Sequence, residues 1–109
     1  MSEIIVRNLL EHGQVPESSI LSSTLQNDEF SKFILFRFAA GQELSAHTAP
    51  FPATLYFVSG DADLRLGDEQ HQAAPGTWAY MPANLVHGIK ARTEVVMLLT
   101  MLKGAKSGA

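Results

Sequence analysis

Residues 41–60 read GQELSAHTAPFPATLYFVSG, and residues 76–91 read GTWAYMPANLVHGIKA. Each stretch contains one histidine, His47 in the first and His87 in the second. A β-strand advances about 3.3 Å per residue, so two histidines this far apart meet only if the chain between them curls back as a sheet. The two stretches therefore predict a site at which His47 and His87 come together.

The rest of the chain consists of short runs of β-forming residues separated by turns that contain glycine or charged residues. Nothing in the sequence supplies helices to connect a parallel sheet, so this spacing predicts an all-β sandwich or barrel. A two-sheet jelly roll would place both histidines in one barrel mouth. The expected strands, the first of them an edge strand, are residues 3–10, 20–25, 33–38, 54–59, 62–67, 77–81, 86–91 and 95–102.

Alternation along these strands predicts which side chains face the interior. If His47 faces inward, so do residues 53, 55 and 57 on the next strand, and residues 89 and 91 follow His87. Along residues 77–81, alternation leaves open whether the two aromatic side chains or their neighbours face inward. The predicted ligand-contacting residues are Leu55, Phe57, Ile89, Trp78 and Tyr80.

Arg37 interrupts an otherwise apolar strand at residues 33–38. Its neighbours Ile34, Phe36 and Phe38 share the opposite face, which belongs in a core. We expect Arg37 at the rim with its guanidinium in water. A cation that lines the cavity and meets a carboxylate ligand is the alternative.

The composition limits the classes of function. The 109 residues, 46% of them hydrophobic, fit one domain spanning residues 1–109, with a disordered tail at residues 103–109. A net charge of −3 offers no electrostatic basis for binding nucleic acid or an acidic membrane surface. The absence of cysteine excludes disulfides and thiolate metal sites. Neither a membrane-spanning run nor a leader is recognisable, so we expect a cytoplasmic protein.

The two histidine stretches resemble the two sequence motifs of the cupins, G-x5-H-x-H-x3,4-E-x6-G and G-x5-P-x-G-x2-H-x3-N. Asn84 stands where the second motif usually has glycine. The resemblance implies a small single-domain cupin of the RmlC-like, conserved-barrel type. Its fold would be a double-stranded β-helix, or jelly-roll barrel, with motif 1 at residues 41–60 and motif 2 at residues 76–91. The positions that agree are Gly41, His47, Gly60, Gly76, Pro82 and His87.

The resemblance also raises the question of a metal. Metal-binding cupins usually supply two histidines and a glutamate from the first motif and one histidine from the second, a set suited to Zn, Ni, Mn or Fe. Here Ala49 and Ala53 stand at the second histidine and the glutamate, and Ala91 replaces the closing asparagine. His47 and His87 remain as possible metal ligands, and two imidazoles alone hold a divalent ion weakly. A divalent metal completed by water or a substrate stays open.

Several functional hypotheses follow for His47 and His87. In the first, the pocket centred on them binds a small, partly apolar molecule with a polar or anionic group. In the second, they are catalytic, either as acid and base in an isomerase- or lyase-type reaction or through a metal in dioxygenase-type chemistry. In the third, they are hydrogen-bonded core residues without further function. The resemblance also implies a homodimer, with residues 4–10 and 95–102 as candidate interface strands.

Overall fold

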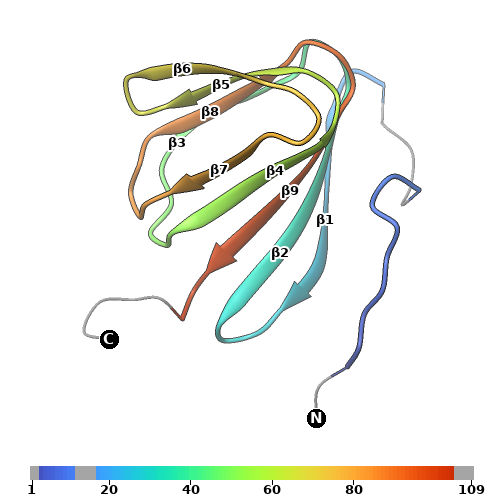
Figure 1. Ribbon diagram of the computed structural model, residues 1–109, viewed down its shortest axis with the longest axis vertical. Coiled ribbons are helices and arrows are strands. Elements are labelled where there is room, and N and C mark those ends of the chain that lie inside the picture. Colours follow the sequence, from blue (N-terminus) through green and yellow to red (C-terminus); the bar gives the residue numbers. More distant parts are fainter. Residues whose placement is uncertain (1–2, 12–16, 105–109) are drawn as a thin grey trace.

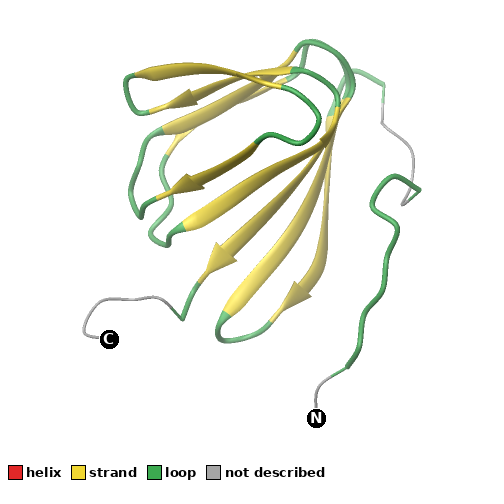
Figure 2. Ribbon diagram, in the orientation of Figure 1, coloured by secondary structure: helices red, strands yellow, loops and turns green. Residues whose placement is uncertain are grey.

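The structure is a computed structural model that describes residues 3–11 and 17–104. Within these ranges the chain forms β-strands and no helix, which Figure 2 shows as two layers joined by loops. No helix in these ranges is therefore long and apolar enough to cross a membrane. The strands are β1 (Ile20–Asn27), β2 (Ser31–Phe38), β3 (Glu43–His47), β4 (Ala53–Ser59), β5 (Ala62–Leu66), β6 (Glu69–Ala73), β7 (Trp78–Met81), β8 (His87–Ala91) and β9 (Val95–Leu102).

The strands form two antiparallel sheets that lie against each other (Figure 1). The five-stranded sheet has the order β1-β2-β9-β4-β7, and the four-stranded sheet has the order β3-β8-β5-β6. Strands distant in the sequence are neighbours, as β2 and β9 or β3 and β8 show. This is the double-stranded β-helix expected from the sequence, and it joins the two histidine stretches through the pairing of β3 with β8.

The core fills the space between the two sheets. Leu55 and Phe57 on β4 are fully buried, and Leu64 on β5 and Ile89 on β8 are at most 2% exposed. Burying one such side chain typically contributes about 1.5–3 kcal/mol. The predicted inward faces of β4 and β8 are confirmed.

Strand β7 resolves the alternative that alternation left open. Ala79 pairs with Leu55 and faces inward, whereas Trp78 pairs with Tyr56 and faces outward. Opposed residues of an antiparallel pair lie on the same face of the sheet, so the register with β4 decides the outcome. Trp78 is 62% exposed and Tyr80 is 50% exposed. Both aromatic side chains therefore lie on the outer face of the sheet and not between the sheets, and their contact with a ligand stays a prediction.

The N-terminal segment differs from the expected edge strand. Residues 3–8 pair with no strand of the described chain, and residues 9–11 form a turn. The carbonyl oxygen of Leu9 accepts a hydrogen bond of 2.7 Å from the Arg37 guanidinium, and Arg37 is only 3% exposed. Arg37 is thus neither at a solvated rim nor in the cavity, because its face of β2 is the outer face, covered there by the N-terminal segment.

Two further expectations differ in detail. Strand β6, Glu69–Ala73, is absent from the expected strands. It pairs with β5 through a two-residue turn that contains Gly67 at φ +61°. At the other end of the chain, Lys103 donates a hydrogen bond of 2.6 Å to Asn27, and Gly104 bonds to the Phe30 carbonyl. The first two residues of the expected disordered tail are therefore placed against the β1–β2 turn, and residues 105–109 lie outside the described chain.

Candidate functional site

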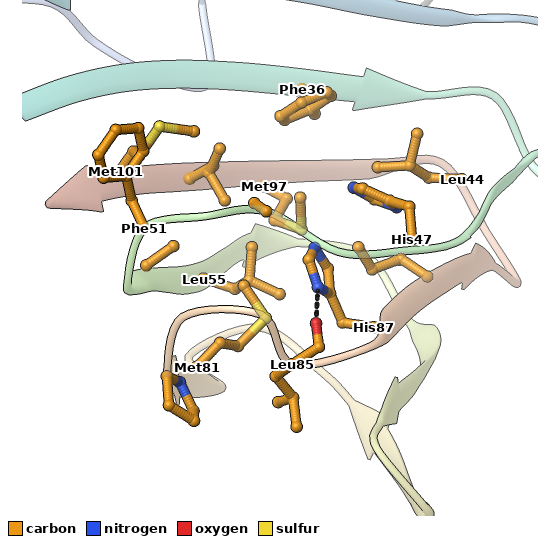
Figure 3. A pocket seen from close by; sticks show the side chains of 15 residues that line it. Phe36, Leu44, His47, Phe51, Leu55, Met81, Leu85, His87, Met97 and Met101 are labelled. Atoms are coloured by element: carbon orange, nitrogen blue, oxygen red, sulfur yellow. Dashed lines mark hydrogen bonds between the residues drawn. The ribbon is translucent and has the colours of Figure 1, made fainter. Parts of the chain in front are cut away.

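A pocket opens between the two sheets, beside the two histidines (Figure 3). Its volume is about 80 Å³. Apart from His47 and His87, the described residues that line it are all apolar. They are Phe36, Leu44, Ala49, Phe51, Ala53, Leu55, Met81, Pro82, Leu85, Ile89, Met97, Leu99 and Met101.

The two histidines are directly opposite each other in the sheet. His47 at the end of β3 pairs with His87 at the start of β8, and the ring centroids lie 4.3 Å apart with an interplanar angle of 53°. His87 is 6% exposed, whereas His47 is exposed to solvent. His87 therefore belongs to the pocket wall, and His47 borders its mouth.

An irregularity in β3 turns His47 toward the pocket. Leu44 and His47 both line the pocket although they are three positions apart, which regular alternation would place on opposite faces. The register shifts between these two residues, as in a β-bulge. Across the pair, a Cβ atom at Gly88 would approach the Ala46 nitrogen to 3.2 Å, so a glycine allows the bulged strand to lie close.

Backbone carbonyl groups orient both imidazole rings. The Nδ1 atom of His47 lies 2.8 Å from the Ser45 carbonyl oxygen, and that of His87 lies 2.9 Å from the Leu85 carbonyl oxygen (Figure 3). A carbonyl oxygen only accepts hydrogen bonds, so Nδ1 carries the proton in each ring. A neutral ring then has its lone pair on Nε2, and neither Nε2 has a hydrogen-bond partner among the described residues. Both rings thus offer an unused nitrogen at the pocket.

Comparison with protein families identifies the fold family. Residues 34–102 match the family model described as the cupin domain. The chain belongs to the cupin family. No curated protein matches its sequence.

Solved structures agree with this assignment. A conserved protein of unknown function from Streptococcus pyogenes has 27% identity and a TM-score of 0.83, over 94% of this chain and 90% of its own. An RmlC-like cupin from Desulfovibrio desulfuricans has 25% identity and a TM-score of 0.84, over 93% and 98%. A cupin 2 conserved barrel domain protein from Leptotrichia buccalis has 26% identity and a TM-score of 0.83, over 89% of this chain and 47% of its own. The predicted cupin barrel is confirmed.

The pocket of this cupin lacks the family's usual carboxylate ligand. Ala49 and Ala53, at the positions of the second histidine and the glutamate, line the pocket with their methyl groups. Within residues 3–11 and 17–104, no three His, Cys, Asp or Glu side chains gather as a metal site. Zinc sites in proteins usually have three or four protein ligands, and zinc, nickel and iron favour imidazole nitrogen while manganese favours carboxylate oxygen. The residues present therefore do not fit the usual cupin metal.

Asn84 replaces the motif glycine without loss of the turn. Its φ angle is +68°, a left-handed conformation that asparagine tolerates better than most other non-glycine residues. The backbone N–H of Asn84 donates a hydrogen bond of 2.8 Å to the Ala49 carbonyl oxygen. This bond connects the turn before β8 to the segment that follows β3. Leu85 comes next, and its carbonyl group orients His87. The turn thus positions the pocket histidine.

Only some of the predicted ligand-contacting residues line the pocket. Leu55 and Ile89 line the pocket, whereas Phe57 is buried in the core and is not among the lining residues. Sequence reasoning missed Phe51, which lies between two prolines where alternation gives no signal, and Leu85, which lies in a turn. For Phe36, alternation along residues 33–38 indicates a side chain that faces the interior, and Phe36 lines the pocket.

Proposed function

We propose that this cupin binds a small, largely apolar molecule whose single polar end meets His47 and His87. The observation that carries the proposal is an apolar pocket bordered by two Nε2 atoms that have no partner within the described chain. Ligand sites combine apolar walls with a few placed polar groups in this way. A neutral Nε2 accepts a hydrogen bond from a ligand O–H or N–H group, and a protonated ring donates one to a carboxylate.

The volume limits the size of the ligand. A cavity of about 80 Å³ is well below the roughly 300 Å³ at which drug-sized sites begin. Met97 and Met101, with unbranched flexible side chains, can adjust the walls to different shapes. The expected ligand is therefore a small acid, alcohol or amine with a short apolar body.

A fragment screen followed by amide proton–nitrogen correlation spectra tests the proposal. Hits should shift the amide signals of residues near His47 and His87. His87→Gln removes the buried imidazole and its hydrogen bond to the ligand, and an affinity loss of about tenfold is expected, equivalent to about 1.4 kcal/mol. His71→Gln is the matched control, because His71 is exposed and bonds to Glu69 at 2.7 Å. Hits whose affinity is the same in the His87→Gln variant would contradict the proposal.

Acid–base catalysis is the second candidate, and the facing imidazoles favour it. Two Nε2 atoms at one pocket can remove a proton from one position of a bound molecule and return it at another. Chemical analysis of bound hits after incubation separates the two functions. A compound recovered unchanged supports binding, whereas an isomer or elimination product that fails to form in the His47→Gln and His87→Gln variants supports catalysis.

We also propose that the protein is a homodimer that associates through the outer face of the five-stranded sheet. Tyr56, Trp78 and Tyr80 are 41%, 62% and 50% exposed there, and Tyr56 and Trp78 are paired neighbours. Exposed aromatic clusters are typical of interfaces. In a twofold interface the same surface of each copy meets the other. The neighbouring Thr54 and Leu98 are uncharged too, so this surface meets itself without charge repulsion.

Sedimentation analysis at micromolar concentration measures the association. The expected result is a dimer mass for the unaltered protein and a monomer mass for Trp78→Glu, which would bury one carboxylate from each copy in an uncharged interface. Val86→Glu, a change at a 38% exposed position outside this aromatic surface, serves as the control. A monomer mass for the unaltered protein would refute the dimer.

A further inference from the structure

A second groove lies between the last strands of the two sheets. The five-stranded sheet ends at β7 and the four-stranded sheet ends at β6, and the turn at residues 74–77 joins these two strands (Figure 1). The groove between them has a volume of about 250 Å³ and shares no described lining residue with the histidine pocket. Leu64, Leu66 and Ala79 contribute apolar side chains to it, and His71 and Gln72 line its β6 side.

The pairing of β7 with β4 leaves half of the β7 backbone groups pointing away from β4. The Thr77 carbonyl oxygen accepts a hydrogen bond of 2.9 Å from the Phe57 N–H group. Hydrogen-bonded and non-hydrogen-bonded positions alternate along an antiparallel pair, so Ala79 is bonded to β4, whereas Trp78 and Tyr80 are not. The N–H and C=O groups of Trp78 and Tyr80 therefore point to the open edge, where no described strand pairs with β7.

Strand β7 also lacks the charged side chains that usually protect a sheet edge. Residues 78–81 read WAYM and contain neither a charge nor a proline. On β6, in contrast, His71 and Glu69 are bonded to each other at 2.7 Å, and His71 is opposite the buried Leu64. Charged residues that point inward at an edge hinder the addition of another strand. The edge that is open to pairing is therefore that of β7.

We propose that an extended peptide segment of another protein adds to β7 as a further strand of the five-stranded sheet and occupies this groove. An added strand binds through main-chain hydrogen bonds, and its alternate side chains provide specificity. The side chains that face inward would contact Leu64, Leu66 and Ala79, so they should be apolar.

The outer face of β7 indicates the chemistry of the other peptide side chains. They would lie beside Trp78 and Tyr80, which are 62% and 50% exposed. Aromatic ring faces attract cations, and the net charge of −3 also favours a basic partner. The expected segment therefore alternates apolar residues with arginine or lysine.

Hydrogen exchange of the β7 amides tests the proposal, with an acetylated and amidated peptide of three Arg-Val repeats as the probe. In the free protein, the amides of Trp78 and Tyr80 should exchange faster than that of Ala79, which is bonded to β4. If the Kd is about 0.1 mM, peptide at about 1 mM should slow exchange at Trp78 and Tyr80 about tenfold. A peptide of three Glu-Val repeats is the charge control and should bind more weakly.

N-methylated peptides separate strand addition from other modes of binding. Methyl groups on the second and fourth peptide nitrogens, or on the third and fifth, remove alternate donors, and only one of these sets faces β7. One methylated peptide should therefore bind at least about tenfold more weakly than the other.

Two protein variants separate this groove from the other proposed sites. Trp78→Glu, which should disrupt the proposed dimer, keeps the β7 backbone and exchanges the ring for a carboxylate that also attracts arginine. His87→Gln changes only the histidine pocket. Both variants should bind the Arg-Val peptide within about threefold of the unaltered protein.

Four results would overturn the proposal. The first is a peptide that leaves exchange at Trp78 and Tyr80 unchanged, and the second is equal binding of the two methylated peptides. The third is slow exchange at these amides before peptide is added, which would show that a second copy already covers the edge. The fourth is loss of peptide binding in Trp78→Glu or His87→Gln.

Discussion

Phe57→Ala is expected to lower the free energy of unfolding by about 3–5 kcal/mol. The Phe57 ring is fully buried between the two sheets. Its strand, β4, is hydrogen-bonded to β7 on one side and β9 on the other, so the backbone cannot move in to fill the cavity. Small domains are stable by about 5–15 kcal/mol in total, so this loss would leave a marginal fold.

Urea unfolding followed by circular dichroism measures the loss. Phe30→Ala is the matched control, because it removes the same ring from a residue that is 64% exposed. The control should cost about 0.5 kcal/mol, as surface substitutions do. Equal losses for the two variants would show that the core does not lie where β4 places it.

Gly60→Ala is expected to cost about 3 kcal/mol or more. Gly60 has φ +88°, and an L-residue in the left-handed region pays about 1–2 kcal/mol. A Cβ atom there would also overlap the Glu94 carbonyl oxygen and lie 2.8 Å from the Val95 Cα atom. Because these neighbours are backbone atoms, the start of β9 would have to move.

Gly76→Ala isolates the steric part of this cost. Gly76 has φ +95°, but a Cβ atom there would have no heavy atom within 4 Å. The control should therefore pay the conformational cost alone, about 1–2 kcal/mol, in the same urea experiment. If both glycine variants lose the same stability, close packing of the β4–β5 turn against the β8–β9 connection is not what requires Gly60.

Much of the fold was predictable because the deciding signals are local. Alternation in β4 and β8 predicts the inward faces of Leu55 and Ile89, since a strand has period two whatever its partner. The spacing of His47 and His87 within two recognisable motifs predicts that they meet. These features depend on residues close to each other in the sequence or on a motif whose spacing is preserved.

The features that were missed depend on partners distant in the sequence. Whether Trp78 faces inward depends on its register with Tyr56, which no local pattern contains. Residues 3–8 have strand-forming side chains, yet no described strand pairs with them, and Arg37 bonds to the turn that follows them. Which nitrogen of each histidine ring carries the proton follows from the carbonyl oxygen that Nδ1 meets. The positions of these carbonyl groups depend on a bulge in β3 and on a turn before β8.

We infer that both histidines present an unprotonated Nε2 to the pocket and that a bound ligand meets these nitrogen atoms there. A long-range proton–nitrogen correlation spectrum of the histidine rings, recorded above the pH at which they are protonated, tests it most directly. For His47 and His87 we expect a protonated Nδ1 and an unprotonated Nε2, and a shift of the His87 Nε2 signal when a fragment hit is added. A proton on Nε2 of His87, or a hit that leaves this signal unmoved, would contradict the inference.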